Sequence, residues 1–403
     1  MDDALQVDGF ITFTLGIIVF FAGKSVNAAI AFLREYNIPE AVTGGIIASL
    51  LGLAVYKGTG KALNYNLEPR DLLLVYFFTT IGLNARLQDL LAGGRPLAIL
   101  LTATIFYIFL QDTVGLLCAK ALDLPAAMAV ITGSASLIGG HGTAIAWASE
   151  ISENYGVPNA LEVGVASATL GLVMASLLGG PIAKVILNKH SLSSSIDDTE
   201  RVGGVSEEQE DLATFGYESF LRALLFIHIA IVIGYAASLG IEDLGIKLPI
   251  FVPCLMVAIA MSNTVPKLFP AIPWPARTKS LALISDLSLA LFISMSLMGM
   301  QLWSIADLAG PLLVILAVQA AVAVAFIFFI IFPMMGRDYL AAVISAGFAG
   351  FSLGSTPTAI ANMTAVTKKY GPAPTAFIIL PLVGAFFVDL TNAFAIQLFL
   401  GFS

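Results

Sequence analysis

Charged side chains are scarce in this sequence. Asp, Glu, Lys and Arg account for 11% of its 403 residues, hydrophobic residues for 58%, and the mean hydropathy is +0.92. Soluble domains carry about 25% charged residues, so a soluble globular protein is excluded. The apolar runs suit helices, which need about 20 residues to cross a bilayer. They do not suit β-barrel strands of about ten residues with alternating polarity. The composition therefore indicates an all-α integral membrane protein.

Cysteine and histidine are also rare. The two cysteines, Cys118 and Cys254, fall inside apolar runs, and the three histidines lack the spacing of metal ligands. We expect no disulfide framework, no metal site beyond a transported ion and no cofactor. A nucleophile-elbow motif is missing, which argues against an enzyme such as an intramembrane hydrolase, and we expect no nucleic-acid partner. The first residues, MDDALQVD, carry no basic side chain, so we expect no cleavable signal peptide.

Ten apolar segments are predicted to cross the membrane. They lie near residues 10–33, 38–56, 72–92, 96–120, 159–187, 223–241, 248–264, 281–303, 309–334 and 373–400. The one long hydrophilic segment, Ser195–Phe215, is rich in Asp and Glu and is interpreted as a solvated linker. The chain is thus divided into an N-terminal membrane repeat (1–190), an acidic cytoplasmic linker (191–216) and a C-terminal membrane repeat (217–403).

The two halves share a motif at a constant offset. Thr143–Ala146 and Thr358–Ala361 both read Thr-Ala-Ile-Ala, 215 residues apart (358 − 143), and the same offset aligns Tyr155 with Tyr370. Internal repeats of this kind build many secondary transporters. With five crossings in each half, the second repeat is predicted to be inverted relative to the first.

The distribution of basic residues predicts the orientation. Lys and Arg prefer cytoplasmic loops, which places both termini in the periplasm and the linker in the cytoplasm. The loop after the first motif holds Glu150 and Glu153, whereas the equivalent loop of the second half holds Lys368 and Lys369. Opposite charges at equivalent positions favour the inversion.

Each half contains one apolar stretch that is not assigned to a crossing. These stretches lie near 124–156 and near 339–371. Five crossings in each half require these stretches to enter the membrane and return as re-entrant hairpins. They contain GGHGTAIAW (Gly139–Trp147) and GSTPTAIAN (Gly354–Asn362), both in charge-free runs. Glycine permits sharp turns and close approach to a ligand, and irregular backbone at membrane depth is tolerated where it is buried or lines a cavity.

Each hairpin is expected to contain the start of a short helix. In the second motif we expect Thr356 to be the N-cap and Pro357 the first helical residue. In the first motif we expect His141 and Gly142 to break the chain and Thr143 to open the helix. Two helix N-termini entering from opposite faces present free N–H groups that suit carboxylates. Loop carbonyls and hydroxyls suit a hard cation such as sodium.

Acidic residues inside predicted spans add to this interpretation, because buried ionisable groups are costly and usually functional. Asp389, Asp112 and Glu162 lie in such positions. Asp389 follows the second hairpin, so we expect it to face the ammonium of a substrate or the bound cation. The residues alone predict an ion-coupled transporter of a small anionic solute, with a passive channel as the alternative.

Several stretches resemble the bacterial sodium:glutamate symporter family. They are IPEAVTGG (Ile38–Gly45), TIGLNA (Thr80–Ala85), the two hairpin motifs and VGAFFVDLTNA (Val383–Ala393). The resemblance covers nearly the whole chain. It implies sodium-coupled import of L-glutamate across the bacterial inner membrane, and a homodimer in lipid in which a transport domain with both hairpins moves against a scaffold. The related 2-hydroxycarboxylate carriers leave a sodium- or proton-coupled carrier of citrate, malate or another di- or tricarboxylate as the alternative.

The hairpin motifs and this resemblance together define two sets of site residues. The predicted substrate-binding set is Gly140, His141, Gly142, Thr143, Ser355, Thr356, Pro357, Thr358, Asn362 and Asp389. The predicted sodium-binding set is Ser136, Gly139, Thr143, Gly354, Asn362, Asp389 and Asn392.

Overall fold

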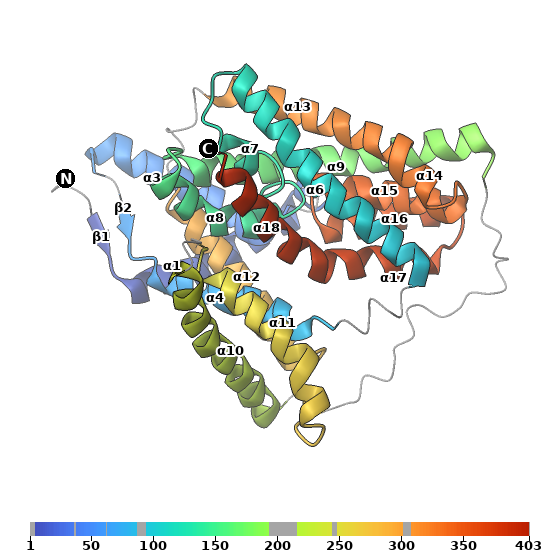
Figure 1. Ribbon diagram of the computed structural model, residues 1–403. Helices are drawn as coiled ribbons and strands as arrows, with labels where there is room; N and C mark the ends of the chain where they lie inside the picture. The colour runs from blue at the N-terminus through green and yellow to red at the C-terminus, as the bar shows by residue number, and fades with distance from the viewer. Residues whose placement is uncertain are drawn as a thin grey trace.

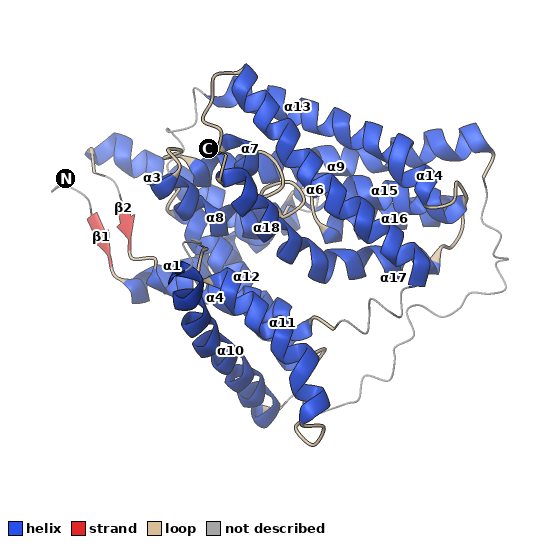
Figure 2. Ribbon diagram, viewed as in Figure 1, coloured by secondary structure: helices blue, strands red, loops and turns tan. Residues whose placement is uncertain are grey.

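The computed structural model describes residues 5–35, 38–61, 63–86, 94–192, 216–243, 248–300 and 308–402, and these ranges are almost entirely helical (Figure 1, Figure 2). The elements of the first half are β1 (Leu5–Val7), α1 (Gly9–Ala29), α2 (Ala31–Glu35), α3 (Glu40–Thr59), β2 (Leu63–Tyr65), α4 (Glu68–Asn84), α6 (Gly94–Ala121), α7 (Met128–Ile131), α8 (Gly140–Asn154) and α9 (Ala160–His190). The two short strands pair in parallel, with Leu5 opposite Leu63.

The second half is also helical. Its elements are α10 (Tyr217–Asp243), α11 (Phe251–Leu268), α12 (Lys279–Met298), α13 (Ala309–Phe326), the π-helical turn η2 (Ile327–Ile331), α14 (Phe332–Met334), α15 (Tyr339–Leu353), α16 (Thr356–Tyr370), α17 (Pro374–Leu382), the π-helical turn η3 (Val383–Phe387) and α18 (Val388–Leu400). Most of the predicted linker, residues 193–215, lies outside the described residues.

The helices confirm the predicted all-α membrane fold. Within the described ranges, eight helical segments are long and apolar enough to cross a bilayer. The other two predicted crossings correspond to α4, which has 17 residues, and to the run α17–η3–α18, which is interrupted by a π-helical turn. Ten crossings and two repeats of inverted topology stay predictions.

The helices pack as two groups (Figure 1). We call α1, α3, α4, α10, α11 and α12 the peripheral group, and α6 to α9 with α13 to α18 the hairpin group. Each group takes the same successive elements from the first and the second half of the chain. In the peripheral group α4 packs against α11, and α12 packs against α3. The 215-residue offset aligns α4 with α12 and α3 with α11. The contact of α4 with α11 and the contact of α12 with α3 are therefore equivalent, which supports an internal repeat.

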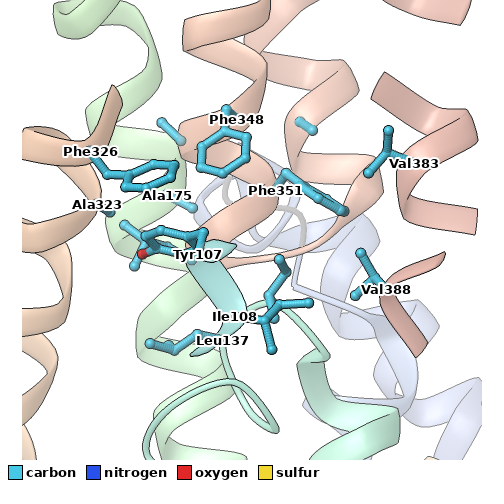
Figure 3. Packing of buried hydrophobic residues seen from close by; sticks show 14 of the residues in the cluster. Tyr107, Ile108, Leu137, Ala175, Ala323, Phe326, Phe348, Phe351, Val383 and Val388 are labelled. Atoms are coloured by element: carbon cyan, nitrogen blue, oxygen red, sulfur yellow. The ribbon is translucent and has the colours of Figure 1, made fainter. Parts of the chain in front are cut away.

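The main hydrophobic core fills the hairpin group (Figure 3). Tyr107 of α6 lies 5.0 Å from Phe326 of α13 and 5.4 Å from Phe348 of α15, measured between ring centroids. All three side chains are buried. Aromatic pairs at these separations add to the stability gained from their burial. The core thus fixes α15, the first arm of the second hairpin, between the long helices α6 and α13.

Candidate functional site

The second predicted hairpin is formed by α15 and α16. Its arms approach closely because Gly350 has no side chain: a Cβ there would lie 2.6 Å from the Ala359 Cα atom. The turn falls at Gly354 and Ser355, and α16 begins at Thr356 with a proline in its first turn. The N-cap is therefore Ser355. The expectation that Thr356 caps the helix is wrong by one residue, because Thr356 already has helical backbone geometry.

The first predicted hairpin is formed by residues 126–154, and its first arm is irregular. After α7 the backbone makes bonds that span five residues, from Ala135 N to Val130 O and from Gly139 N to Ser134 O, at 3.2 and 2.9 Å. The chain then turns at Gly140, whose φ of 71° lies in the left-handed region that favours glycine. The helix α8 begins at this residue. The expected break at His141-Gly142 is thus displaced, because both residues lie inside the first helical turn.

The two hairpin turns meet in the structure. A Cβ at Gly140 would lie 3.5 Å from the carbonyl oxygen of Gly354. Gly171 of α9 lies beside both turns, since a Cβ there would come within 2.3 Å of the Leu353 carbonyl oxygen and 2.8 Å of Leu137 Cδ2. The N-termini of α8 and α16 therefore lie at a common junction, which rests on α9.

We predict that Gly171→Ala destabilises the protein by about 1–3 kcal/mol, the usual cost of overpacking. The added methyl group would collide with backbone of the second hairpin, which cannot rotate away as a side chain does. Gly180→Ala, on the same helix, is the matched control because no atom of the described residues lies within 4 Å of a Cβ there. Thermal unfolding of each purified variant measures its unfolding midpoint. Equal unfolding midpoints for the two variants would contradict the close contact at Gly171.

Two neighbouring residues of α6 form hydrogen bonds to the two hairpins, one to each. Asp112 is fully buried, and its carboxylate accepts hydrogen bonds from Ser134 N and Ser134 Oγ, both at 2.8 Å. Gln111 Nε2 donates to the carbonyl oxygen of Ser352 at 3.0 Å. Asp112 thereby holds the first hairpin and Gln111 the second. One turn of α6 connects the irregular arm of one hairpin to the end of α15 in the other.

A second amide continues this polar cluster into α13. Gln319 Nε2 donates to the backbone carbonyl of Gln111 at 2.8 Å, and both side chains are fully buried. Within the described part of the chain, Gln111 Oε1 and Gln319 Oε1 have no hydrogen-bond partner. Buried polar atoms normally have partners, because leaving them unpaired costs about 1–3 kcal/mol. These oxygen atoms therefore suit the binding of an ordered water molecule or a cation.

The last helical run passes both hairpins. A Cβ at Gly384, in η3, would lie 2.5 Å from Thr356 Oγ1 at the start of α16. Further along, Asn392 of α18 donates from Nδ2 to the carbonyl oxygen of Ser134 at 3.0 Å. Asp389 lies between these two contacts, in the first turn of α18. Its half-buried carboxylate has no hydrogen-bond or ion-pair partner among the described residues.

Other predicted site residues also lie near the first turn of α8. His141 is buried, and its Nε2 lies 2.9 Å from Thr169 Oγ1 of α9. Gly142 faces the peripheral group instead, with a Cβ position 3.6 Å from both Phe77 and Leu289. Thr143 is buried close to Gly139.

The remaining predicted residues are engaged in contacts of their own hairpin or of α9. Ser355 Oγ lies 3.2 Å from Thr358 Oγ1, and Ser136 Oγ donates to the carbonyl of Ile131. Asn362 lies farther along α16 and donates from Nδ2 to the carbonyls of Ala175 and Ala346, at 3.0 and 3.3 Å. The amide nitrogen of Asn362 thus holds α16 on α9 and α15, and its carbonyl oxygen is the atom left to bind a ligand.

Comparison with known proteins decides the family. The chain matches the family described as sodium/glutamate symporter over residues 5–372. A sodium/glutamate symporter of Escherichia coli (strain K12) is 36% identical over 395 residues, which cover 98% of this chain and 98% of the relative. That of Haemophilus influenzae is 35% identical over 388 residues, 95% of this chain and 94% of the relative. The chain belongs to the sodium/glutamate symporter family.

Membership in the sodium/glutamate symporter family confirms the resemblance noted in the sequence, and with it the prediction of a multi-pass membrane transporter. A solved structure of a sodium proton antiporter from Methanocaldococcus jannaschii aligns with 98% of this chain and 97% of its own, at 13% identity and a TM-score of 0.42. That likeness is too distant to add to the argument.

Sequence reasoning missed three residues of this family member's hairpin junction: Gln111, Gln319 and Gly171. Gln319 was detectable in principle, since it is the one strongly polar side chain in the apolar run of α13. Gln111 adjoins Asp112, which drew attention through its charge. Gly171 carried no signal, because glycine is common in membrane helices and nothing in the sequence indicates which one meets two hairpin turns.

Proposed function

We propose that this protein imports L-glutamate across the bacterial inner membrane together with Na⁺, by alternating access. The observation that carries the proposal is the junction of two helix N-termini, at Gly140 and Thr356, which the run η3–α18 contacts through Gly384 and Asn392. Asp389 lies between these two contacts in the chain, and its carboxylate has no partner among the described residues. The relatives are named sodium/glutamate symporters, which agrees with a site for an anionic amino acid and a cation.

Near their turns the hairpins offer no Lys or Arg side chain to an anion. Lys and Arg are absent from 124–156 and from 339–367 in the sequence. The carboxylates of glutamate are therefore held by backbone N–H groups at the starts of α8 and α16 and by the hydroxyls of Thr143, Ser355 and Thr356. The first N–H groups of a helix have no partner inside the helix and carry its positive dipole end. Asp389 then balances the ammonium group or Na⁺.

Oxygen atoms around the first hairpin suit sodium. Asn392 Oδ1 is buried without a hydrogen-bond partner in the described residues, while its Nδ2 is fixed on Ser134. It lies against Gly139, whose Cβ position is 2.7 Å from Asn392 Nδ2. Hard cations prefer such carbonyl and carboxylate oxygens. We assign Na⁺ to the surroundings of Gly139, Asn392 and Asp389.

The division into two groups supports an elevator-type movement. Both hairpins and their supports lie in the hairpin group, and its contacts with the peripheral group include apolar pairs such as Trp147 with Phe251, whose ring centroids are 6.1 Å apart. Apolar surfaces can slide without breaking hydrogen bonds. We propose that the hairpin group moves as a transport domain against the peripheral group, which serves as the scaffold of a homodimer.

Uptake into proteoliposomes tests the proposal. Radiolabelled L-glutamate should accumulate against its gradient when an inward sodium gradient is applied, and not when potassium replaces sodium. Unlabelled citrate or malate should compete poorly. Accumulation of citrate instead of glutamate would favour the alternative carrier, and glutamate flux without concentration would indicate a channel.

The inverted topology gives a further prediction. Glu153 and Lys368 are both exposed, and they lie at the ends of α8 and α16, the helices that contain the equivalent motifs of the two halves. In a variant lacking Cys118 and Cys254, single cysteines introduced at Glu153 and Lys368 are expected to react with an impermeant reagent from opposite sides, periplasmic for the first and cytoplasmic for the second. Labelling of both from one side would refute the inversion.

A further inference from the structure

A cavity of about 340 Å³ lies in the peripheral group, away from the hairpins. Its walls come from the first turns of α10 and from the loop between α11 and α12. Ser219, Arg222, Trp274, Pro275 and Thr278 are among the lining residues. This cavity has no part in the transport site proposed above.

The surroundings of this cavity are basic. The end of α4 joins it through Trp274 Nε1, which donates to the Leu83 carbonyl at 3.1 Å. The cavity thus lies where α4 and α11 end and where α10 and α12 begin. The charged residues in the described parts of these four helix ends are Arg86, Glu218, Arg222, Lys267, Arg277, Lys279 and Asp286. The opposite ends of α4 and α10 carry Glu68, Asp71, Glu242 and Asp243 with Arg70. Positive charge therefore exceeds negative charge at this end of α4, α10, α11 and α12, where it attracts anionic lipid headgroups.

Arg222 is the cationic group inside the cavity. It pairs with Glu218 of the preceding turn at 2.7 Å, but the Glu218 side chain is 86% exposed, against 34% for Arg222. An ion pair with so exposed a partner contributes little. The Arg222 guanidinium can therefore exchange Glu218 for a phosphate, which it binds through two parallel hydrogen bonds.

Trp274 and α10 extend the cavity toward the lipid phase. The Trp274 ring packs on Phe226 with centroids 4.8 Å apart, so its position is fixed. Tryptophan is enriched at the depth of the headgroups. Leu225 and Ile229 follow Arg222 at intervals of three and seven residues, which places them on the same face of α10. They are 57% and 38% exposed. The cavity, with Arg222 in its wall, thus continues into an apolar strip along the helix.

We propose that this cavity binds an anionic phospholipid, with its phosphate on Arg222 and an acyl chain along Leu225 and Ile229. Charge alone would equally suit inorganic phosphate. The apolar strip below Arg222 favours the lipid, because inorganic phosphate makes no use of it. The lipid would lie between α10 and the loop before α12, and so brace the peripheral group.

Native mass spectrometry of the full-length protein in a neutral detergent tests this site. Dioleoyl phosphatidylglycerol is expected to bind about tenfold more tightly than dioleoyl phosphatidylcholine. Arg222→Gln should weaken phosphatidylglycerol binding about fivefold, as expected for about 1 kcal/mol from one basic residue at a membrane surface. Arg222→Lys should retain most of it. Thermal unfolding without added lipid checks that each variant is folded.

Arg70→Gln is the control, because Arg70 also pairs with an exposed carboxylate, that of Asp71 at 2.6 Å, at the opposite end of α4. It should leave phosphatidylglycerol binding unchanged. Equal binding of the two lipids, or equal losses in Arg222→Gln and Arg70→Gln, would overturn the proposal. Complete displacement of phosphatidylglycerol by millimolar inorganic phosphate would also overturn it, since the site would then bind a free anion.

Discussion

Asp389→Asn is expected to abolish sodium-driven glutamate uptake in a protein that inserts normally. The substitution keeps the shape of the side chain and removes its charge. In the proposed site this charge balances the substrate ammonium or Na⁺, and removing one partner of a buried pair costs about 3–5 kcal/mol. A loss of that size corresponds to more than about a hundredfold in affinity. Uptake into proteoliposomes, normalised to the amount of inserted protein, measures the effect.

Asp389→Glu and Thr391→Ala serve as controls for this experiment. Asp389→Glu keeps the charge and should retain part of the uptake if the space between Gly384 and Asn392 admits one more methylene group. Thr391, also on α18, belongs to neither predicted ligand set, and its substitution should leave transport close to normal. If Asp389→Asn imports glutamate with unchanged sodium dependence, Asp389 is structural and the proposed charge balance is wrong.

Asp112→Ala is expected to reduce uptake to a small fraction of the original value and to lower the thermal unfolding midpoint. It removes two hydrogen bonds that Ser134 donates to the carboxylate, each of a kind that contributes about 1.5–3 kcal/mol, and leaves buried groups of the first hairpin unpaired. The irregular arm has few regular backbone bonds of its own, so it depends on this support. Uptake and unfolding should therefore decline together.

Asp112→Asn tests whether position 112 needs only hydrogen bonds to Ser134 or also a negative charge. The asparagine oxygen can still accept from Ser134 N, and its nitrogen can donate to Ser134 Oγ, whose hydroxyl also accepts hydrogen bonds. We expect transport within about twofold of the unmodified protein. An inactive Asp112→Asn that folds normally would show that the negative charge itself is required, and would place Asp112 in the ion pathway.

Sequence reasoning was most successful where composition and motifs impose strong constraints. Long apolar runs predicted the spanning helices, and the glycines with Pro357 placed both hairpin turns within one to three residues. The exact start of each helix was missed, because Ser355 and Thr356 are both good caps and only the backbone dihedral angles distinguish them. The position of the first turn was similarly ambiguous, because Gly139, Gly140 and Gly142 each permit a turn.

Contacts between distant segments could not be predicted from the sequence. The bonds from Gln111 to Ser352 and from Asn392 to Ser134 join residues 241 and 258 positions apart. No local pattern specifies which polar groups meet at such separations. The role of Asn362 shows the same limit: its position on α16 was predicted, but its hydrogen bonds to Ala175 and Ala346 follow from how α9 and α15 pack.

The bond between Gln111 and Ser352 also bears on how the protein is made. Synthesis at about 5–20 residues per second leaves a delay on the order of 10–50 s between these two residues. α6 and α9 are completed early in that interval, well before the second hairpin is synthesised. The buried amide of Gln111 must spend this time without Ser352. Completion of the hairpin group is therefore limited by translation of the second half, and a chain released early would leave the polar face of α6 in contact with lipid.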